Sequence, residues 1–423
     1  MKNKHIKIGV IGLGYVGLPI AIEFGKKYNV VGFDKNITRI EQLLSKYDKN
    51  NDYRQKDFNN SKFLYFSSQI NDLNTCNVFI VCVPTPVTKS NKPDLNFIKL
   101  ACQDLSLLLK KNDTVIFEST VYPGMTEEVC IPILEKNSKL ILNKDFYCGY
   151  SPERINPNDK KHRLTNIVKI TSGSNNKTSI FVDNLYKSII KAGTYRVKSI
   201  KIAEAAKVIE NSQRDLNIAF MNELSIIFDK LNIDTLDVLK AASTKWNFLN
   251  FKPGLVGGHC IGVDPYYLSY KSKIAGYNPK VINSGRAVND QFVNFVAKKT
   301  IYETKKIFPQ QNLKFLVLGL TFKENCSDFR NSKSIELVKK LIAKKYEVHC
   351  YDPYANKSDL DKFKNLNFKY QLKKNFYHCI VITVSHKDFK IMGQKKISNF
   401  LKTKGVIFDI KNTLPKNLNN IYI

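Results

Sequence analysis

Residues 257–268 read GGHCIGVDPYYL and place a cysteine and an acid close to a pair of glycines. Cys260 comes shortly after Gly257 and Gly258, and Asp264 lies four residues beyond Cys260. Glycines let a backbone approach a ligand closely, because no Cβ stands in the way. A cysteine in such a loop can be a nucleophile, a metal ligand or a small buried side chain. The rest of the chain has to distinguish these three.

A second candidate site lies near the N-terminus, where Gly12, Gly14 and Gly17 form a GxGxxG pattern between a strand-like and a helix-like segment. An acid, Asp34, follows about 20 residues later, as the dinucleotide fingerprint requires. The first glycine makes the tight turn, the second admits the pyrophosphate and the third packs helix on strand. Asp34 can accept hydrogen bonds from both ribose hydroxyls and would repel the 2′-phosphate of NADP. The pattern therefore predicts an NAD site.

An NAD site in the same chain suggests a chemical role for Cys260. Oxidation of a primary alcohol to a carboxylate takes two hydride transfers, and the intermediate aldehyde has to be retained. A thiolate captures the aldehyde as a thiohemiacetal, a second NAD takes hydride to give a thioester, and water hydrolyses it. Such a thiolate needs a lowered pKa, which a nearby lysine or arginine can provide. These requirements favour a nucleophile at Cys260, with the glycines making room for the reacting carbon.

Composition narrows the class of protein. A chain of 423 residues with 43% hydrophobic and 25% charged residues is typical of a globular protein with two or three domains. The nine cysteines form no CxxC and the six histidines no HExxH, so we expect reduced thiols and no metal site. No apolar stretch is long enough to span a bilayer and no signal-peptide cleavage site is apparent, which predicts a cytoplasmic protein without membrane insertion.

The net charge of +30 raises the question of a nucleic-acid partner. Only eight of the 67 basic residues are arginines, and they form no cluster. No RRM, KH or zinc-finger signature is present, and a basic balance alone informs only about solubility and non-specific binding. A polyanionic small substrate fits better than a specific nucleic acid.

Strands and helices alternate at both ends of the chain, which predicts βαβ units and parallel sheets. The strand-like runs are 6–13, 30–34, 78–86 and 114–120, and then 315–322, 347–352, 379–385 and 406–412. Residues 200–245 carry apolar positions at helical spacing. The predicted fold is α/β, with two Rossmann-like doubly wound parallel-sheet domains joined by a central helical domain with a long helix. We place the NAD-binding domain at 1–198, the helical domain with the cysteine loop at 199–300 and a second nucleotide-binding domain, without the glycine triplet, at 301–423.

Several long motifs resemble those of the UDP-glucose/GDP-mannose dehydrogenase family and occur in the family's order. They are GLGYVGLP, VPTP, ESTVYPG, SPERINP, EAAKVIEN, GGHCIGVDPYYL and FKENCSDFRNSKS. The SPERINP and GGHCIGVDP forms are similar to the UDP-N-acetylhexosamine 6-dehydrogenase branch, whereas the UDP-glucose branch usually reads PEFL and GGxCFPKD. Asn158 replaces a usual glycine and Ser327 a usual proline, and neither change removes a chemical group.

The resemblance implies roles for individual residues. Cys260 matches the nucleophile, Lys207 the lysine that stabilises the oxyanion or moves a proton, and Asp264 the acid that orients water or partners the lysine. Asn211 shares a helix face with Lys207, and Thr120 and Glu153 resemble the pair that positions the hydrolytic water. The implied NAD contacts are Gly12, Gly14, Tyr15, Val16, Gly17, Asp34, Arg39, Thr85, Thr120 and Arg330. The implied substrate contacts are Glu153, Arg154, Lys207, Asn211, Arg214, Gly257, Arg286, Phe322 and Lys323.

The implied activity is NAD-dependent, four-electron oxidation of the C6 hydroxyl of a UDP-N-acetylhexosamine to the uronic acid, for a surface polysaccharide precursor. UDP-N-acetylmannosamine and UDP-glucose are alternative substrates. A two-electron hydroxyacid dehydrogenase is an alternative enzyme, although it needs neither Cys260 nor a second α/β domain. A non-enzymatic NAD-sensing protein leaves Cys260, Lys207 and Asp264 together unexplained. The long helix favours a homodimer or a higher homo-oligomer.

Overall fold

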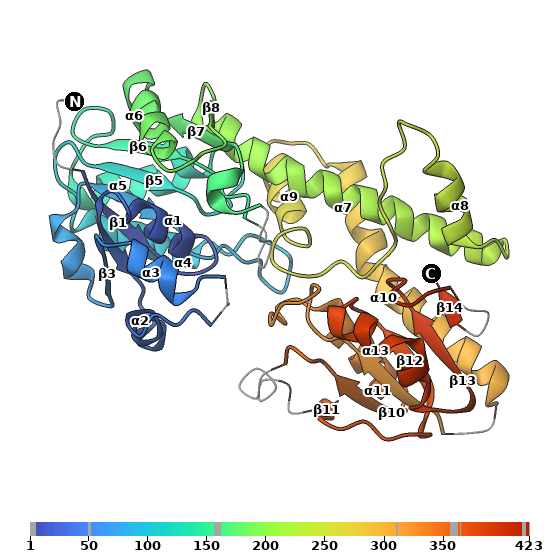
Figure 1. Cartoon of the computed structure of the whole chain (residues 1–423). Helices are drawn as coiled ribbons and strands as arrows, with labels where there is room; N and C mark the ends of the chain where they lie inside the picture. Colours follow the sequence, from blue (N-terminus) through green and yellow to red (C-terminus); the bar gives the residue numbers. More distant parts are fainter. Residues whose placement is uncertain are drawn as a thin grey trace. The chain divides into compact units, whose positions relative to one another are not determined.

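The computed structural model describes residues 6–49, 52–155, 162–309, 312–355, 363, 365–416 and 420–422. Asn158, one of the two departures from the family pattern, lies outside these ranges. The chain forms two compact units (Figure 1). Unit 1 comprises Met1–Glu210 and Tyr266–Asn278, and unit 2 comprises Asn211–Pro265 and Pro279–Ile423. The residues predicted as a central domain are thus divided between the two units.

Unit 1 is built on an eight-stranded sheet of order β3-β2-β1-β4-β5-β6-β7-β8. Its strands are β1 (Lys7–Ile11), β2 (Asn29–Phe33), β3 (Leu64–Ser67), β4 (Val78–Val81), β5 (Thr114–Phe117), β6 (Tyr147–Tyr150), β7 (Lys169–Gly173) and β8 (Thr194–Arg196). The first six are parallel, whereas β7 is antiparallel to β6, a reversal that the strand–helix alternation did not predict.

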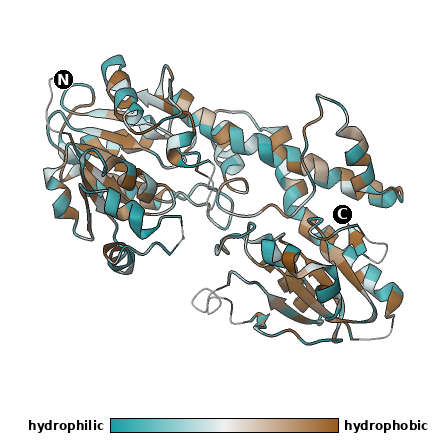
Figure 2. Ribbon diagram, in the orientation of Figure 1, coloured by the Kyte–Doolittle hydropathy of each residue, from teal (hydrophilic) through white to brown (hydrophobic). Residues whose placement is uncertain are grey.

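The helices on the sheet of unit 1 are α1 (Gly17–Phe24), α2 (Ile37–Leu44), α3 (Gln55–Asn60), α4 (Asn96–Ser106), α5 (Ile131–Ser138) and α6 (Asn176–Lys187), with shorter turns at Ile70–Thr75, Thr126–Cys130 and Leu164–Asn166. Helix α9 (Asp264–Ile274) begins with the last two residues of a unit 2 segment and continues in unit 1. The central strands are buried on both sides and therefore read as continuous apolar runs, which appear brown in Figure 2.

Unit 2 contains a six-stranded parallel sheet of order β11-β10-β9-β12-β13-β14. Its strands are β9 (Lys314–Leu318), β10 (Glu347–Tyr351), β11 (Asn367–Phe368), β12 (Tyr377–Ile382), β13 (Leu401–Asp409) and β14 (Asn420–Tyr422). Its helices are α8 (Thr235–Ala242), α10 (Lys280–Ile307), α11 (Lys333–Ala343) and α13 (Lys387–Ser398). The predicted fold class, two doubly wound domains separated by a long helix, is confirmed. Strand order reverses between β1 and β4 and again between β9 and β12, and such switch points are where α/β sheets bind ligands.

The long helix α7 (Ile200–Lys230) has 31 residues and runs from unit 1 into unit 2. The helical segment predicted to reach residue 245 is interrupted, because Asn232 adopts a positive φ of 55° and Asp234 caps α8 through the backbone N–H groups of Leu236 and Asp237. Among the described residues, no helix has both the length and the apolar content that a membrane span requires.

Helix α7 buries many polar side chains and exposes some apolar ones. Its buried polar residues are Glu204, Lys207, Asn211, Ser212, Asp215, Asn222 and Ser225, beside the buried apolar residues Ile200, Ala203, Val208, Ala219 and Met221. Its exposed apolar residues are Ile202, Ile209, Phe220 and Ile227. Burying polar groups is costly unless they are hydrogen-bonded or used for binding, so we expect the buried polar positions to include functional residues.

Candidate active site

The GxGxxG turn joins β1 to α1, and each of its glycines has a different steric environment. Gly12 adopts a φ of +90°, and Gly17 lies so close to Gly12 O that an added Cβ would overlap that oxygen. An added Cβ on Gly14, in contrast, would meet no atom within 4 Å. Gly12 and Gly17 are therefore needed by the fold, whereas Gly14 borders open space, as expected where a pyrophosphate would lie.

Asp34 and Arg39 organise the surroundings of this turn. Asp34 follows β2 and accepts hydrogen bonds from Leu13 N–H at 2.8 Å and from Asn36 N–H at 2.9 Å. Arg39 is buried, donates to Leu13 O at 3.0 Å and pairs with Asp48 at 3.0 Å. Its Nη1 is buried and has no hydrogen-bond partner among the described residues. These contacts fix the end of β2 next to the turn.

The turn fits NAD on two counts. The open space at Gly14 admits a phosphate near the N-terminus of α1, and the Asp34 carboxylate stands at the end of β2, where the ribose of a dinucleotide is bound. Tyr15 and Val16 lie half-buried on the same turn, and Thr85 lies half-buried beyond β4. The other predicted NAD contact of unit 1, Thr120, is half-buried beyond β5.

Beyond β5, Glu118 and Lys169 form a buried ion pair that supports the SPER segment. Lys169 Nζ lies 2.6 Å from Glu118 Oε2 and also donates to the carbonyl oxygens of Pro152, at 2.9 Å, and Ser151, at 3.2 Å. Tyr186 donates its hydroxyl hydrogen to the other Glu118 oxygen. Burial raises the pKa of Glu118 although Lys169 opposes the shift. Lys169 thus ties the backbone immediately before Glu153 to the sheet.

Glu153 is a buried carboxyl group among cations. Its side chain is 8% exposed, and Oε1 has no hydrogen-bond partner among the described residues. Burial raises its pKa to about 7, although the charges of Lys207, Lys169 and Arg154 oppose the shift. Lys207, on α7, is itself only 3% exposed. A carboxyl group that titrates near neutral pH is suited to moving a proton.

The cysteine loop lies in unit 2 and ends at the start of α9. Asp264 N–H and Val263 N–H both donate to Cys260 O at 2.9 Å, so a tight turn joins the cysteine to the acid. The Asp264 carboxylate accepts a hydrogen bond of 2.5 Å from Asn211 Nδ2, and both side chains are buried. Of the nine cysteines, all of which lie in described parts of the chain, Cys260 alone is not buried.

The glycine pair before Cys260 packs against a loop of the second sheet domain. An added Cβ on Gly257 would overlap Asn331 O, and one on Gly258 would lie 2.5 Å from the ring of Phe322. Gly258 also adopts a φ of +86°, which L side chains rarely tolerate. The structure therefore gives each glycine a protein neighbour, whereas the predicted space for a sugar carbon stays a prediction.

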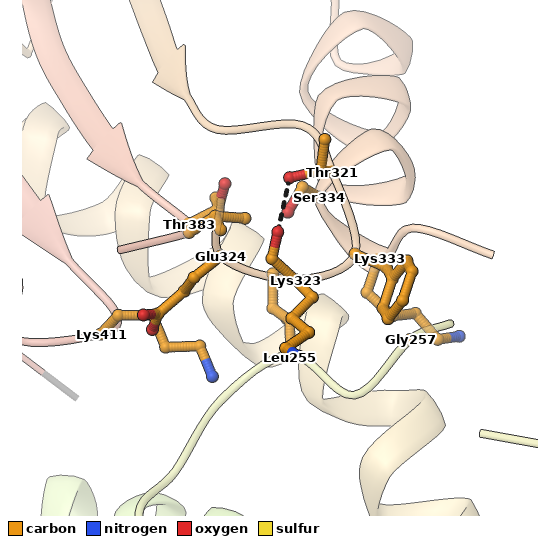
Figure 3. A pocket seen from close by; sticks show the side chains of 11 residues that line it. Leu255, Gly257, Thr321, Lys323, Glu324, Lys333, Ser334, Thr383 and Lys411 are labelled. Carbon is orange, nitrogen blue, oxygen red and sulfur yellow. Dashed lines mark hydrogen bonds between the residues drawn. The ribbon is translucent and has the colours of Figure 1, made fainter. Parts of the chain in front are cut away.

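A pocket of about 220 Å³ opens at the switch point between β9 and β12, and Figure 3 shows it from close by. Lys323, Lys333 and Lys411 line it, together with one acid, Glu324, so its charge is net positive. Lys333 is the first residue of α11, where the helix dipole adds to the positive potential. Burial lowers the pKa of Lys411, and the charge of Glu324 opposes that shift. The pocket is suited to a diphosphate.

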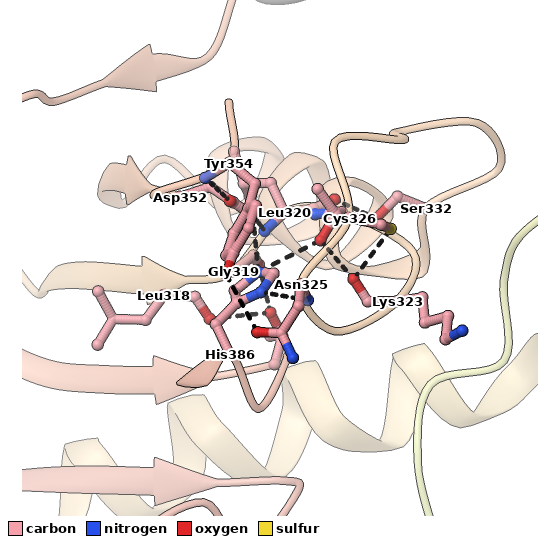
Figure 4. Close-up of polar contacts among 12 residues, drawn as sticks. Leu318, Gly319, Leu320, Lys323, Asn325, Cys326, Ser332, Asp352, Tyr354 and His386 are labelled. Atoms are coloured by element: carbon pink, nitrogen blue, oxygen red, sulfur yellow. Dashed lines mark hydrogen bonds and ion pairs between the residues drawn. The ribbon is translucent and has the colours of Figure 1, made fainter. Parts of the chain in front are cut away.

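The end of β10 repeats the geometry of the first nucleotide turn, because its acid again accepts from backbone N–H groups beyond the neighbouring strand; Figure 4 shows these contacts in the second sheet domain. Gly319 adopts a φ of +90°, and Asp352 Oδ2 accepts hydrogen bonds from Leu320 N–H at 2.6 Å and Thr321 N–H at 3.1 Å. Buried His386 accepts from Asn325 N–H at its Nδ1, so its Nε2 carries the hydrogen that faces Asp352 Oδ2 at 3.2 Å. Tyr354 N–H donates to Asp352 Oδ1 at 2.8 Å.

The remaining predicted residues have protein partners or lie at the surface. Arg154 is ion-paired with Glu210, and Arg286 is buried with Asp215 and Asp290, at 2.5 and 2.7 Å. Arg214 is exposed on α7. Phe322 and Lys323 lie at the second pocket. Arg330 holds Asp328 through contacts of 2.5 to 3.0 Å.

Some residues of the site were not predicted from the sequence. Two of them carry a local signal: Lys333 lies at the N-terminus of helix α11, and Lys411 lies shortly beyond the end of strand β13. Glu204, which accepts hydrogen bonds from Gly124 N–H and Thr126 N–H and so ties α7 to the ESTVYPG loop, has no local signature. The same holds for Lys169. For His259, the signal in the sequence is its position directly before Cys260.

The two domains together have the architecture of a dinucleotide-dependent dehydrogenase with a second nucleotide-binding domain. The chain belongs to the UDP-glucose/GDP-mannose dehydrogenase family. Family models match residues 6–190 as the NAD binding domain, 201–291 as the central domain and 316–416 as the UDP binding domain. The predicted family and the predicted cofactor, NAD, are thereby confirmed.

Two full-length relatives are UDP-N-acetyl-D-glucosamine 6-dehydrogenases. That of Salmonella typhi is 49% identical over 99% of this chain and 98% of its own. That of Pseudomonas aeruginosa is 47% identical over 99% of both chains. The structure is also similar to that of a UDP-D-ManNAc dehydrogenase from Pyrococcus horikoshii, with a TM-score of 0.86 and 29% identity over 99% of this chain and 98% of that one.

Proposed function

We propose that the protein oxidises the C6 hydroxyl of UDP-N-acetylglucosamine or UDP-N-acetylgalactosamine to the carboxylate, through a covalent adduct on Cys260. The observation that carries the proposal is the cysteine loop. The one cysteine outside the protein core follows the glycine pair, and a tight backbone turn joins it to Asp264, whose carboxylate accepts a hydrogen bond from Asn211. The identity of 47–49% to UDP-N-acetyl-D-glucosamine 6-dehydrogenases supports the substrate class. The uronic acid product suits a precursor of a surface polysaccharide.

NAD, when bound, accepts hydride in each of the two oxidations. The Cys260 thiolate adds to C6 at the aldehyde level to give a thiohemiacetal, and loss of the second hydride leaves a thioester that water cleaves. Lys207 offers positive charge to the oxyanion. Glu153, whose pKa is about 7, takes a proton from the attacking water. Asp264, held by Asn211, orients the groups around the adduct.

The lysines of the second pocket support a UDP-linked substrate. Lys323, Lys333 and Lys411 provide three cations for two phosphates, at the switch point of the domain matched by the UDP binding model. A UDP-sugar panel tests the substrate class. We expect kcat/KM for the two N-acetylhexosamines to exceed those for UDP-glucose and UDP-N-acetylmannosamine at least tenfold. A higher value for UDP-glucose would show that the motif variants do not report the sugar.

The covalent step is tested by counting NADH. Wild-type protein should release two NADH per sugar oxidised, which also excludes a two-electron hydroxyacid dehydrogenase. Cys260→Ala should bind NAD and UDP-sugar but make little uronic acid, with at most one NADH per active site. Cys260→Ser should accumulate an ester-like adduct, because serine is a poorer leaving group than a thiolate. Cys102→Ala, at a fully buried cysteine, is the control and should lower stability while leaving two NADH per sugar. Near-normal acid production by Cys260→Ala would contradict the mechanism.

The exposed apolar side chains of α7 support the proposal of a homodimer. The exposed apolar side chains of α7 include Phe220, at 53% exposure, and Ile227, at 44%. A second copy of the chain would remove this face from water, in keeping with the role expected of the long helix. We expect sedimentation to show a dimer that Phe220→Glu/Ile227→Glu weakens, while Phe63→Glu, at an exposed site directly before β3, leaves it intact. A wild-type monomer at micromolar concentration would contradict this assignment.

A further inference from the structure

His259 is placed to act on the thiol of Cys260. Its Nδ1 lies 3.2 Å from Cys260 Sγ, within the distance of an S–H···N hydrogen bond. Its other nitrogen, Nε2, lies 3.6 Å from Asp328 Oδ2, too far for a hydrogen bond but close enough for attraction to an imidazolium. An acid, an imidazole and a thiol thus follow one another in the order that activates cysteine nucleophiles in other enzymes.

The surrounding protein holds these three groups in place. The His259 ring meets the edge of Phe322 with ring centroids 5.3 Å apart. Phe322 N–H donates to Asp328 O at 3.0 Å, so the segment that positions the ring also positions the acid. The glycine pair is anchored on the same loop, since Gly258 N–H donates to Asn331 O at 3.3 Å. Cys260, His259 and Asp328 are therefore parts of one packed unit.

We propose that His259 is the general base that takes the proton from the Cys260 thiol, with Asp328 stabilising the resulting imidazolium. The S–H bond breaks, its proton moves to Nδ1, and the electron pair stays on sulfur as the thiolate. No oxidant or further reactant takes part. This assignment rests on the proposed function only in making Cys260 the nucleophile, and it gives the activation of the thiol to a residue other than Lys207.

The charges around the imidazole oppose one another in part. Asp328 is 8% exposed and attracts an imidazolium, whereas Arg330 also pairs with Asp328 and partly neutralises it. Burial raises the pKa of the Asp328 carboxyl, but the hydrogen bonds and charge of Arg330, together with His259, outweigh burial and leave it lowered. Asp328 is consequently an anion at neutral pH. Arg330→Ala should strengthen the attraction between the Asp328 carboxylate and the His259 imidazolium.

Alkylation by iodoacetamide measures the thiolate without substrate or cofactor. Cys260 is the one cysteine that is not buried, so labelling of the folded protein reports on it, and Cys260→Ser identifies any background. We expect His259→Phe, which retains a ring against Phe322, to raise the pH midpoint of labelling by at least one unit. Labelling at pH 7 should accordingly slow about tenfold or more. Asp328→Asn should shift the midpoint in the same direction by less.

Three controls separate this role from a merely structural one. Added imidazole should restore fast labelling to His259→Ala, because it can enter the space left by the ring. Lys207→Met should leave the labelling midpoint within 0.3 unit of wild type, roughly the precision of such a titration. If His259→Phe does not fold, the smaller His259→Asn replaces it, with the same expected shift.

Wild-type labelling kinetics in folded His259→Phe and His259→Asn would overturn the proposal, as would a midpoint that moves only in Lys207→Met. The proposed function fails differently, through absence of two NADH per sugar in wild-type protein that shows the predicted labelling. In turnover, His259→Phe should lower kcat at pH 7 at least tenfold. Its KM for the UDP-sugar should change less than threefold, because the sugar nucleotide keeps its lysine pocket.

Discussion

Replacement of Lys169 by methionine should destabilise unit 1 and impair the reaction. The methionine fills much of the lysine's volume but leaves Glu118 without its cation, in a position where its side chain is fully buried. It also removes the hydrogen bonds to Ser151 O and Pro152 O. Removing one partner of a buried ion pair typically costs about 3–5 kcal/mol, and we expect a loss of unfolding free energy of about 4 kcal/mol.

The loss should depend on pH with a defined sign. Burial already raises the pKa of Glu118, and removal of Lys169 raises it further. The native state then holds a proton that the unfolded state releases, so stability falls as pH rises. The destabilisation by Lys169→Met should therefore be larger at pH 8 than at pH 6. The double variant Lys169→Met/Glu118→Gln, which removes the unpaired charge, should recover about half of the loss at pH 8 and show little pH dependence.

Urea unfolding followed by circular dichroism measures these differences. Tryptophan fluorescence would not report on unit 1, because the one tryptophan, Trp246, belongs to unit 2 and is 97% exposed. Lys240→Met is the matched control. Lys240 pairs with Asp237 at the surface, where both side chains are more than half exposed, so its loss should leave the urea midpoint nearly unchanged. A loss in Lys169→Met no larger than in Lys240→Met would refute the view that the ion pair supports the SPER segment.

Three further predictions concern the nucleotide turn and the buried acid. Asp34→Ala should weaken NAD binding and improve NADP binding, and equal turnover of both cofactors by the unmutated protein would contradict the role of Asp34. Gly14→Ala should unfold within about 0.5 kcal/mol of wild type yet bind NAD at least tenfold more weakly in calorimetry, whereas Gly17→Ala should not fold, because its Cβ would overlap Gly12 O. Burial raises the pKa of Glu153 from 4.5 to about 7, so the native protein keeps a proton that the unfolded chain releases between these pH values. The free energy of unfolding of the wild type should therefore fall over this range by about 3 kcal/mol relative to Glu153→Gln. Parallel pH dependences of the two urea midpoints would show that Glu153 is not buried in solution.

Much of the fold and part of the site follow from local sequence patterns. The glycine turn and Asp34 are close in sequence, and so are Cys260 and Asp264, which are joined by a backbone hydrogen bond from Asp264 N–H to Cys260 O. The partners that complete the site are distant in sequence. Lys169 meets Glu118 across 51 positions and Asn211 meets Asp264 across 53, and no spacing rule connects residues at such separations.

Two further features could not be predicted because they depend on tertiary packing. The apolar spacing of residues 200–245 predicts a helix but not which side chains are buried, and α7 buries Lys207 and Asn211 while Ile209 and Phe220 are exposed. Arg286 was assigned to the substrate on the resemblance alone, and nothing in its local sequence indicated the buried pair with Asp215. A contact between Arg286 and the substrate stays a prediction. Asp215 and Asp290 already occupy much of the Arg286 guanidinium.

The matching acids of the two sheet domains differ in how many acceptor positions they retain. A carboxylate offers about four lone-pair positions. Asp352 uses them for Leu320 N–H, Thr321 N–H, Tyr354 N–H and His386. Asp34 accepts only from Leu13 N–H and Asn36 N–H among the described residues, which leaves two positions for the two hydroxyls of a ribose. An adenosine ribose that entered the second domain would meet a saturated carboxylate, so we expect the carboxylate of Asp352 to hold its own loops together and the carboxylate of Asp34 to hold the ribose.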